Sequence, residues 1–173
     1  TYTVTGTGDC PDASATVTVT IVDQLDAGVN GATDVCDDET QVDLYAAING
    51  TPQSGGTWTD VDLTGAVTGN LFDASVQGAG VYHFNYVLQG SVGWADDSSQ
   101  VTVTVTAGPD AGLDGNREVC SEGAIFDLFS ELNGTPDPGG IWRIGGVVHS
   151  NVYVSSVDDP GDYTYTVTGN GPC

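Results

Sequence analysis

The chain has 173 residues, and 24 Asp and Glu against two Lys and Arg give it a formal net charge of −22. Nucleic-acid binding requires clustered Lys and Arg against the phosphates, so this composition excludes nucleic acid as a partner and disfavours anionic membrane surfaces. No run of the sequence approaches the roughly 18 apolar residues of a membrane span, so we expect no membrane insertion.

The first predicted element is a β-hairpin at the N-terminus. Val17, Val19 and Ile21 alternate with threonines along residues 15–22, and such alternation predicts a strand with one buried face. Residues 2–6, Tyr-Thr-Val-Thr-Gly, supply a second alternating run before it. We therefore expect the last two strands of a β-domain here, joined by a Gly-rich turn.

The next elements are short strands separated by Gly and Asn-Gly turns. Residues 81–88 and 101–106 alternate apolar and polar side chains, and the short run 56–60 carries a tryptophan. The apolar run 41–48 fits either a strand or, over residues 44–48, a helical turn. Several short strands at this spacing predict an all-β sandwich.

The sequence repeats itself with an offset of 84 residues, which indicates tandem modules. Asn-Gly-Thr-Pro at 49–52 returns at 133–136, and Trp58 returns as Trp142. The repeat predicts further elements over residues 124–132, 140–144 and 163–167.

Past the tryptophans the offset falls to 81, which aligns Tyr82 with Tyr163. The difference of three residues lies in the intervening loop, residues 61–70 and 144–151. We expect this loop to vary between repeats, because surface loops tolerate insertion and carry binding functions.

These offsets divide the chain into three parts. Residues 1–25 are the C-terminal hairpin (strands F and G) of a preceding repeat, 26–109 are a complete repeat, and 110–173 are a repeat that lacks its last strand. The pattern is cut at both ends, so we expect either a window of a longer array or a protomer that borrows a strand from its neighbour. Borrowing would join molecules by strand addition.

Each repeat is predicted to be an immunoglobulin-like β-sandwich of seven strands with Greek-key connections. Trp58 and Trp142 occupy the place of the core tryptophan on strand C, and Tyr82 and Tyr163 that of the tyrosine corner at strand F. We predict a structural role in the core for all four side chains.

Four cysteines in such a chain indicate an oxidising compartment. Cys120 and Cys173 belong to one folded repeat, so we expect a disulfide between them, which leaves Cys36 free. The alternative is a bond across a repeat boundary, Cys10 to Cys36, which leaves Cys120 free. The cysteine spacing does not predict a zinc site.

Acidic and amide side chains recur at the joints between repeats. Oxygen ligands four residues apart in a Gly-bent loop suit a hard cation, so we predict Ca²⁺ sites at the joints. The candidate ligands are Asp26, Asn30, Asp110, Asp114 and Asn116. The alternative interpretation is a set of Asx turns, which are common where Asp precedes Gly.

No combination of residues predicts catalysis, so we do not expect an enzyme. Only His83 and His149 could act as bases near neutral pH, and neither belongs to a catalytic motif. The Gly-rich loops are not followed by the Lys of a phosphate-binding loop.

The pattern Val35-Cys36, Asn49-Gly-Thr-Pro52, Gly55-Gly-Thr-Trp58 and Gly80-Val-Tyr82, followed by a Thr/Val strand, resembles the Ig-like or PKD-like repeats of very large secreted surface adhesins of gliding and related bacteria. The resemblance covers the whole chain and implies an extracellular location, a long surface stalk and cell adhesion. It implies neighbouring repeats as partners and, in many such proteins, glycan contact.

The function expected from the sequence is therefore a structural or adhesive repeat of a cell-surface filament. The alternative is a binding module, for glycans or proteins, that uses the variable loops 61–70 and 144–151.

Overall fold

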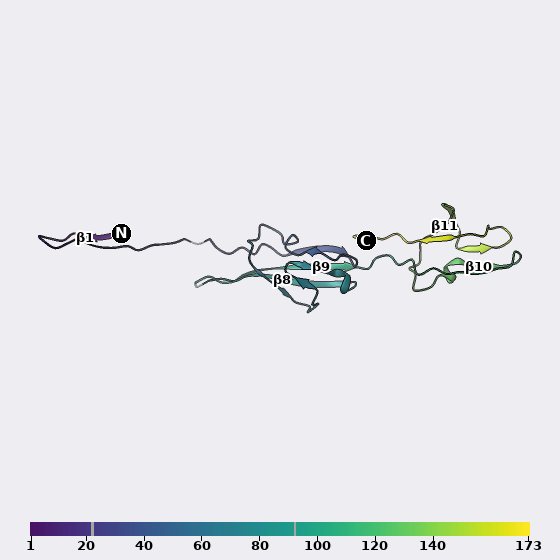
Figure 1. Ribbon diagram of the computed structural model, residues 1–173, viewed down its shortest axis with the longest axis horizontal. Coiled ribbons are helices and arrows are strands. Elements are labelled where there is room, and N and C mark those ends of the chain that lie inside the picture. Colours follow the sequence, from purple (N-terminus) through teal and green to yellow (C-terminus); the bar gives the residue numbers. More distant parts are fainter. Residues whose placement is uncertain (22, 92) are drawn as a thin grey trace.

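A computed structural model describes residues 1–21, 23–91 and 93–173. The protein is all-β and elongated (Figure 1), with an N-terminal arm, a central module and a C-terminal module in a row. None of the helices in these residues is long and apolar enough to cross a membrane.

The central module contains two sheets. In the larger sheet, β3 (Gly31–Cys36), β9 (Asp97–Thr106), β8 (Gly80–Leu88) and β5 (Thr57–Asp60) follow one another in that order. Strand β9 runs parallel to β3 and antiparallel to β8. The smaller sheet has the order β4 (Val42–Asp43), β7 (Leu71–Phe72) and β6 (Val67–Thr68), and the 3₁₀ helix η1 (Ala74–Val76) follows it.

The core of the central module is continuous and includes the alternating face of β9. Val101, Val103 and Val105 are 0%, 0% and 3% exposed, while the threonines between them point away from the core. Phe84 and Tyr86 of β8 are buried beside them. The predicted period-two pattern is therefore confirmed in β9.

The C-terminal module is built from shorter elements. Strand β10 (Ile125–Asp127) pairs with β13 (Val152–Val154), and the 3₁₀ helix η2 (Leu128–Glu131) follows β10. A second sheet has the order β12 (Val147–His149), β11 (Ile141–Ile144) and β14 (Tyr163–Thr166). Its buried core is small, consisting of Leu128, Trp142 and Tyr153.

The N-terminal arm holds one short hairpin of β1 (Tyr2–Val4) and β2 (Ala13–Ala15). The strand predicted over 15–22 is wrong for residues 16–21, which have no strand partner in the described part of the chain. A strand needs a neighbour to accept its backbone hydrogen bonds. Val22, at the end of the predicted strand, lies outside the described residues.

Two other local predictions change. The run 41–48 is strand only over Val42–Asp43 and then turns, as the alternative interpretation allowed, and 124–132 likewise passes from β10 into η2. Asp43 and Asp127 accept hydrogen bonds from the backbone two residues later and so start both turns.

The sequence register of Tyr163 is also corrected. Trp58 pairs with Tyr86 and Trp142 pairs with Tyr165, so Tyr163 is the counterpart of Phe84 and not of Tyr82. From β8 to β14 the offset is therefore 79, and the variable loop is shorter in the C-terminal module than the sequence alignment implied.

Candidate functional site: the module joint and an open sheet edge

The two modules share a set of hydrogen bonds around their first turn, which we call the frame. An isolated bridge joins Val29 to Asn49 in the central module and Leu113 to Asn133 in the C-terminal module. The Asn49 side chain donates to the carbonyl of Asn30 at 2.7 Å, and Asn133 makes the same bond in its own module at 2.8 Å. The repeated Asn-Gly-Thr-Pro segment thus fixes the same turn in both modules.

A tyrosine hydroxyl closes each frame, from a buried side chain in Tyr86 and a half-buried one in Tyr165. Tyr86 accepts from the backbone of Gly56 at 2.8 Å and donates to the carbonyl of Gln53 at 2.7 Å. Tyr165 makes the equivalent bonds with Gly140 and Asp137. The glycines are required because a Cβ at Gly56 would lie within 2.5 Å of the Tyr86 ring.

The four residues predicted for the core lie as follows. Trp142 is buried, and Trp58 packs against the core of its module, in each case beside the closing tyrosine. Tyr82 and Tyr163 are half-buried, and their hydroxyls donate to the carbonyls of Gly78 and Asp159, each four residues earlier. Each hydroxyl thus bonds the backbone of the segment that leads into its strand.

The disulfide joins the two modules, which corrects the sequence prediction. Cys173 is bonded to Cys36, with Cα atoms 5.0 Å apart, and not to Cys120. Cys36 ends β3, whose parallel pairing with β9 brings it beside Thr106, the last residue of β9 before the linker to the next module. The turn after β14 folds back onto the same place, where the Cys173 sulfur lies 3.4 Å from the Thr106 carbonyl.

The remaining cysteines, Cys10 and Cys120, are free and exposed within the described chain. Residues 115–119, which precede Cys120, are all exposed and form no strand or helix. No described element therefore carries Cys120 to Cys173. The sequence could not show this, because the parallel β3–β9 pair that places Cys36 at the linker depends on contacts far apart in the chain.

Three of the five residues predicted to bind Ca²⁺ accept hydrogen bonds from backbone N–H groups. Asp26 and Asp110 accept from the backbone of the residue two positions on, at 2.8 and 2.7 Å, as Asx turns do. Asn30 accepts from the backbone of Gln100, while Asp114 and Asn116 are exposed.

Over the described residues, Cys36, Asp37 and Cys173 are the one group of three or more His, Cys, Asp or Glu side chains with ligand atoms close enough to share an ion. Its cysteines are joined in the disulfide, and Asp37 accepts from the linker backbone at Gly108. Ca²⁺ at the predicted positions stays a prediction, which a thermal melt with and without a chelator tests.

The C-terminal module has an open sheet edge. In the central module β9 fills the space between β3 and β8, but in the described chain no strand lies between residues 115–120 and β14. Residues 115–120, the counterpart of β3, are exposed and form no strand.

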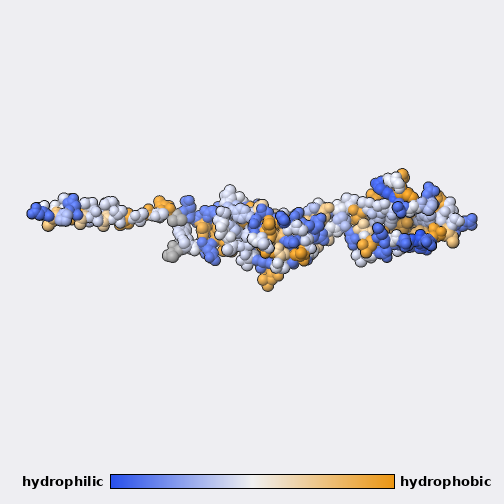
Figure 2. Space-filling model, in the orientation of Figure 1, coloured by the Kyte–Doolittle hydropathy of each residue, from blue (hydrophilic) through white to orange (hydrophobic). Residues whose placement is uncertain are grey.

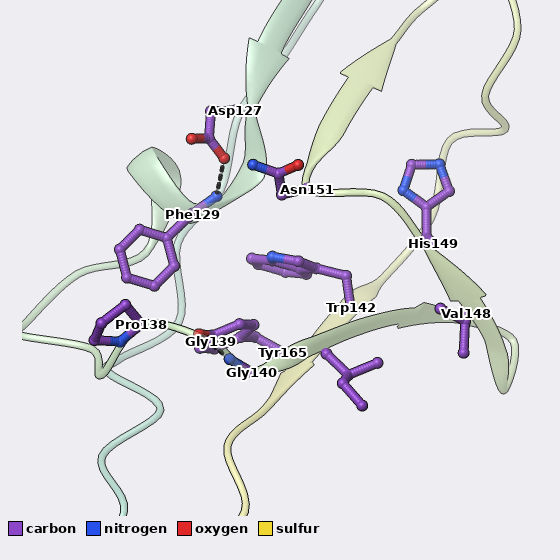
Figure 3. A pocket seen from close by; sticks show the side chains of 11 residues that line it. Asp127, Phe129, Pro138, Gly139, Gly140, Trp142, Val148, His149, Asn151 and Tyr165 are labelled. Carbon is purple, nitrogen blue, oxygen red and sulfur yellow. Dashed lines mark hydrogen bonds between the residues drawn. The ribbon is translucent and has the colours of Figure 1, made fainter.

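An aromatic hollow of about 530 Å³ lies on the C-terminal module (Figure 3). Trp142 lies in its middle, with Phe129 and Tyr165 close by. His149, the last residue of β12, and Asn151, just after it, line it as well, so the segment 144–151 predicted as a loop contains a strand.

One ion pair joins the end of β12 to the turn after β13 in this module. His149 Nε2 lies 3.1 Å from the Asp158 carboxylate, which also accepts from the backbone of Val154 at 2.7 Å. The hydrogen bond to Asp158 raises the pKa of His149. The backbone hydrogen bond from Val154, with that from His149, lowers the pKa of Asp158.

Comparison with protein-family models, curated proteins and solved structures finds no significant match to the chain. Its function has to be inferred from the disulfide at the joint, the open edge and the aromatic hollow.

Proposed function

We propose that this chain is a structural repeat of an extracellular bacterial filament or stalk, in which β-modules are joined end to end. The observation that carries the proposal is the Cys36–Cys173 disulfide, because it links the end of one module to the last turn of the next. Structural disulfides persist outside the reducing cytoplasm, which supports an extracellular location.

We propose further that the modules are immunoglobulin-like. In the central module the order β5-β8-β9 corresponds to strands C-F-G, and β4-β7-β6 corresponds to B-E-D of the second sheet. Strand β3 is then a first strand that has joined the C-F-G sheet beside G. The tyrosine-corner hydrogen bonds support the same assignment.

A structural role fits the surroundings of the two histidines better than catalysis does. His83 and His149 each face one carboxylate, Asp62 at 3.0 Å and Asp158 at 3.1 Å. The Ser150 hydroxyl beside His149 donates to the carbonyl of Val152, so it is not aligned as a nucleophile.

Small-angle X-ray scattering of the oxidised and reduced chain tests the proposal. We expect the oxidised chain to scatter as an extended particle with its two modules held at one mutual orientation. Reduction should free the joint and broaden the distribution of distances between modules. Cys120→Ser is the matched control, and it should scatter like the parent chain. Identical scattering profiles before and after reduction would contradict the proposed role of the disulfide in holding the two modules together.

A second function, glycan binding, is supported by the aromatic hollow. Aromatic rings with nearby polar side chains from a variable loop are suited to a small polar ligand, and His149 and Asn151 supply such groups. A glycan array with the chain and its Asn151→Ala variant tests this candidate. Submillimolar binding lost in the variant would support it, and the absence of any hit would leave the structural role alone.

A further inference from the structure

The aromatic hollow of the C-terminal module has a pair of polar side chains on its rim. Asp127 ends β10, and Asn151 immediately precedes β13, the strand with which β10 pairs. In Figure 3 both side chains lie along one side of the hollow, next to Phe129 and Trp142. All of the lining residues fall between 127 and 165, within the C-terminal module.

The central module has the same pair of residues, and there the two side chains bond to each other. The carbonyl of Asn70 accepts the backbone hydrogen bond that the carbonyl of Asn151 accepts in the C-terminal module. Asp43 likewise takes the position of Asp127 at the start of the following turn. The Asn70 carboxamide donates to Asp43 Oδ1 at 2.7 Å, so this amide and this carboxylate satisfy each other.

In the C-terminal module the pair is open. Asp127 Oδ1 accepts from the backbone of Phe129 at 3.0 Å, and nothing in the described chain donates to Oδ2. No hydrogen bond joins Asn151 to Asp127 in Figure 3, and no described group bonds the Asn151 carboxamide. The pair therefore presents one free carboxylate oxygen and one free amide to the same hollow.

The surface next to this pair is aromatic. Trp142 is 5% exposed and lies against Tyr165, with the ring centroids 4.9 Å apart. Phe129 is half-buried and packs edge-on against Tyr165. A ring face beside free hydrogen-bonding groups suits a pyranose, because a sugar has an apolar C–H face as well as hydroxyl groups.

The charge around the hollow disfavours an anionic ligand. In Figure 2 hydrophilic side chains are interspersed with hydrophobic ones over the C-terminal module, and across the chain the charged residues are 24 acidic and two basic. Neither arginine lines the hollow. His149 has both ring nitrogens occupied, Nε2 by Asp158 at 3.1 Å and Nδ1 by the Ser150 carbonyl at 2.7 Å. A carboxylate or sulfate would meet the Asp127 charge without a free cation to offset it.

We propose that the hollow binds a neutral or amine-bearing pyranose, which rests on glycan binding as the second function proposed above. A sugar hydroxyl donates to Asp127 Oδ2, and the Asn151 amide donates to the oxygen of the same or the neighbouring hydroxyl. The C–H face of the sugar packs against Phe129. The central module, whose Asp43–Asn70 pair is closed, takes no part.

Titration of the full chain with methyl glycosides of glucose, galactose and mannose, with their amino sugars and with their uronates, tests the ligand class. Nuclear magnetic resonance shifts of the Trp142 indole and the Asn151 amide report binding at the hollow. We expect at least one neutral or amine-bearing sugar to bind, and its uronate to bind at least roughly 10-fold more weakly.

Two outcomes of this titration overturn the proposal and differ in what they leave. A uronate that binds as tightly as its neutral counterpart overturns the ligand class but leaves glycan binding in place. Binding by none of the sugars overturns the proposal together with the second function. Neither outcome bears on the structural role, which the scattering experiment tests separately.

Substitutions at the polar pair test the site, with matched controls in the central module. Asp127→Asn keeps a side chain that can cap the turn but removes the free carboxylate oxygen. We expect Asp127→Asn and Asn151→Ala each to weaken binding of the sugar roughly 10-fold. Asp43→Asn and Asn70→Ala change the corresponding residues of the central module and should leave the affinity unchanged. Equal losses in the two modules, or no loss in either, would overturn the assignment of the site.

Discussion

The central and C-terminal modules have the same frame but are filled to different extents. Both have the bridge at the Asn-Gly turn, the tyrosine hydroxyl bonded to a glycine backbone and the tryptophan beside it. Among the described residues, the central module has β9 between β3 and β8, whereas no strand lies in the corresponding place beside β14 of the C-terminal module. The turns and closing hydrogen bonds therefore form from a module's own residues, whereas a closed core also needs the last strand.

The largest effect that tests this comparison is the loss of the disulfide. On the chain-entropy model a bond that closes a separation of 137 residues stabilises by about 5 kcal/mol. We expect Cys36→Ser to lower the free energy of unfolding by a few kcal/mol in denaturant titrations and Cys120→Ser to leave it unchanged. A loss of stability in Cys120→Ser with none in Cys36→Ser would contradict the Cys36–Cys173 pairing.

The next effect compares the two cores directly. Phe84→Ala removes a fully buried ring, which costs about 3–5 kcal/mol. Its counterpart Tyr163 is only half-buried, so Tyr163→Ala should cost less. Chemical unfolding of both variants measures the difference. Similar losses would mean that the C-terminal core is as closed as the central one.

A smaller effect tests the shared frame. Tyr86→Phe and Tyr165→Phe each remove a hydroxyl that makes two backbone hydrogen bonds, and each should cost about 1–3 kcal/mol. We expect comparable losses in thermal melts, because the bonds are the same in both modules. A neutral Tyr165→Phe would show that the frame is not formed in the C-terminal module.

The smallest effect is a pH dependence confined to the C-terminal module. The pKa of His149 is raised, so its contribution to stability is complete below the unfolded pKa and is lost as pH rises through the folded value. The pKa of Asp158 is lowered, so its contribution is present above its unfolded pKa and is lost as pH falls through the folded value. In melting curves, His149→Gln should abolish the loss of stability near neutral pH. An unchanged dependence of stability on pH would show that another group causes that loss.

Much of the fold could be predicted from alternation and repetition. The strands around residues 81–88 and 101–106 are confirmed as β8 and β9, and the short runs with tryptophans are confirmed as β5 and β11. The sequence of residues 15–22 has the same alternation as β9, but the described residues 16–21 form no strand. Alternation reports which face a strand would bury, and it cannot report whether a neighbour is present.

The disulfide could not be predicted for a related reason. Grouping cysteines by repeat paired Cys120 with Cys173, because both lie in one sequence unit. The observed bond depends on the parallel β3–β9 pair, which carries Cys36 to the linker, and on the turn after β14, which returns Cys173 to the same place. Both are contacts between residues distant in sequence.

Single-molecule stretching between the two ends of the chain tests most directly whether the disulfide joins the two modules as proposed. In the oxidised chain, force passes from residue 36 through the disulfide to residue 173, so residues 37–172 should bear no tension and should not extend. Reduction should add up to roughly 470 Å of extension, at about 3.4 Å for each residue. An oxidised chain that extends by its full length would contradict a disulfide that carries load across the two modules.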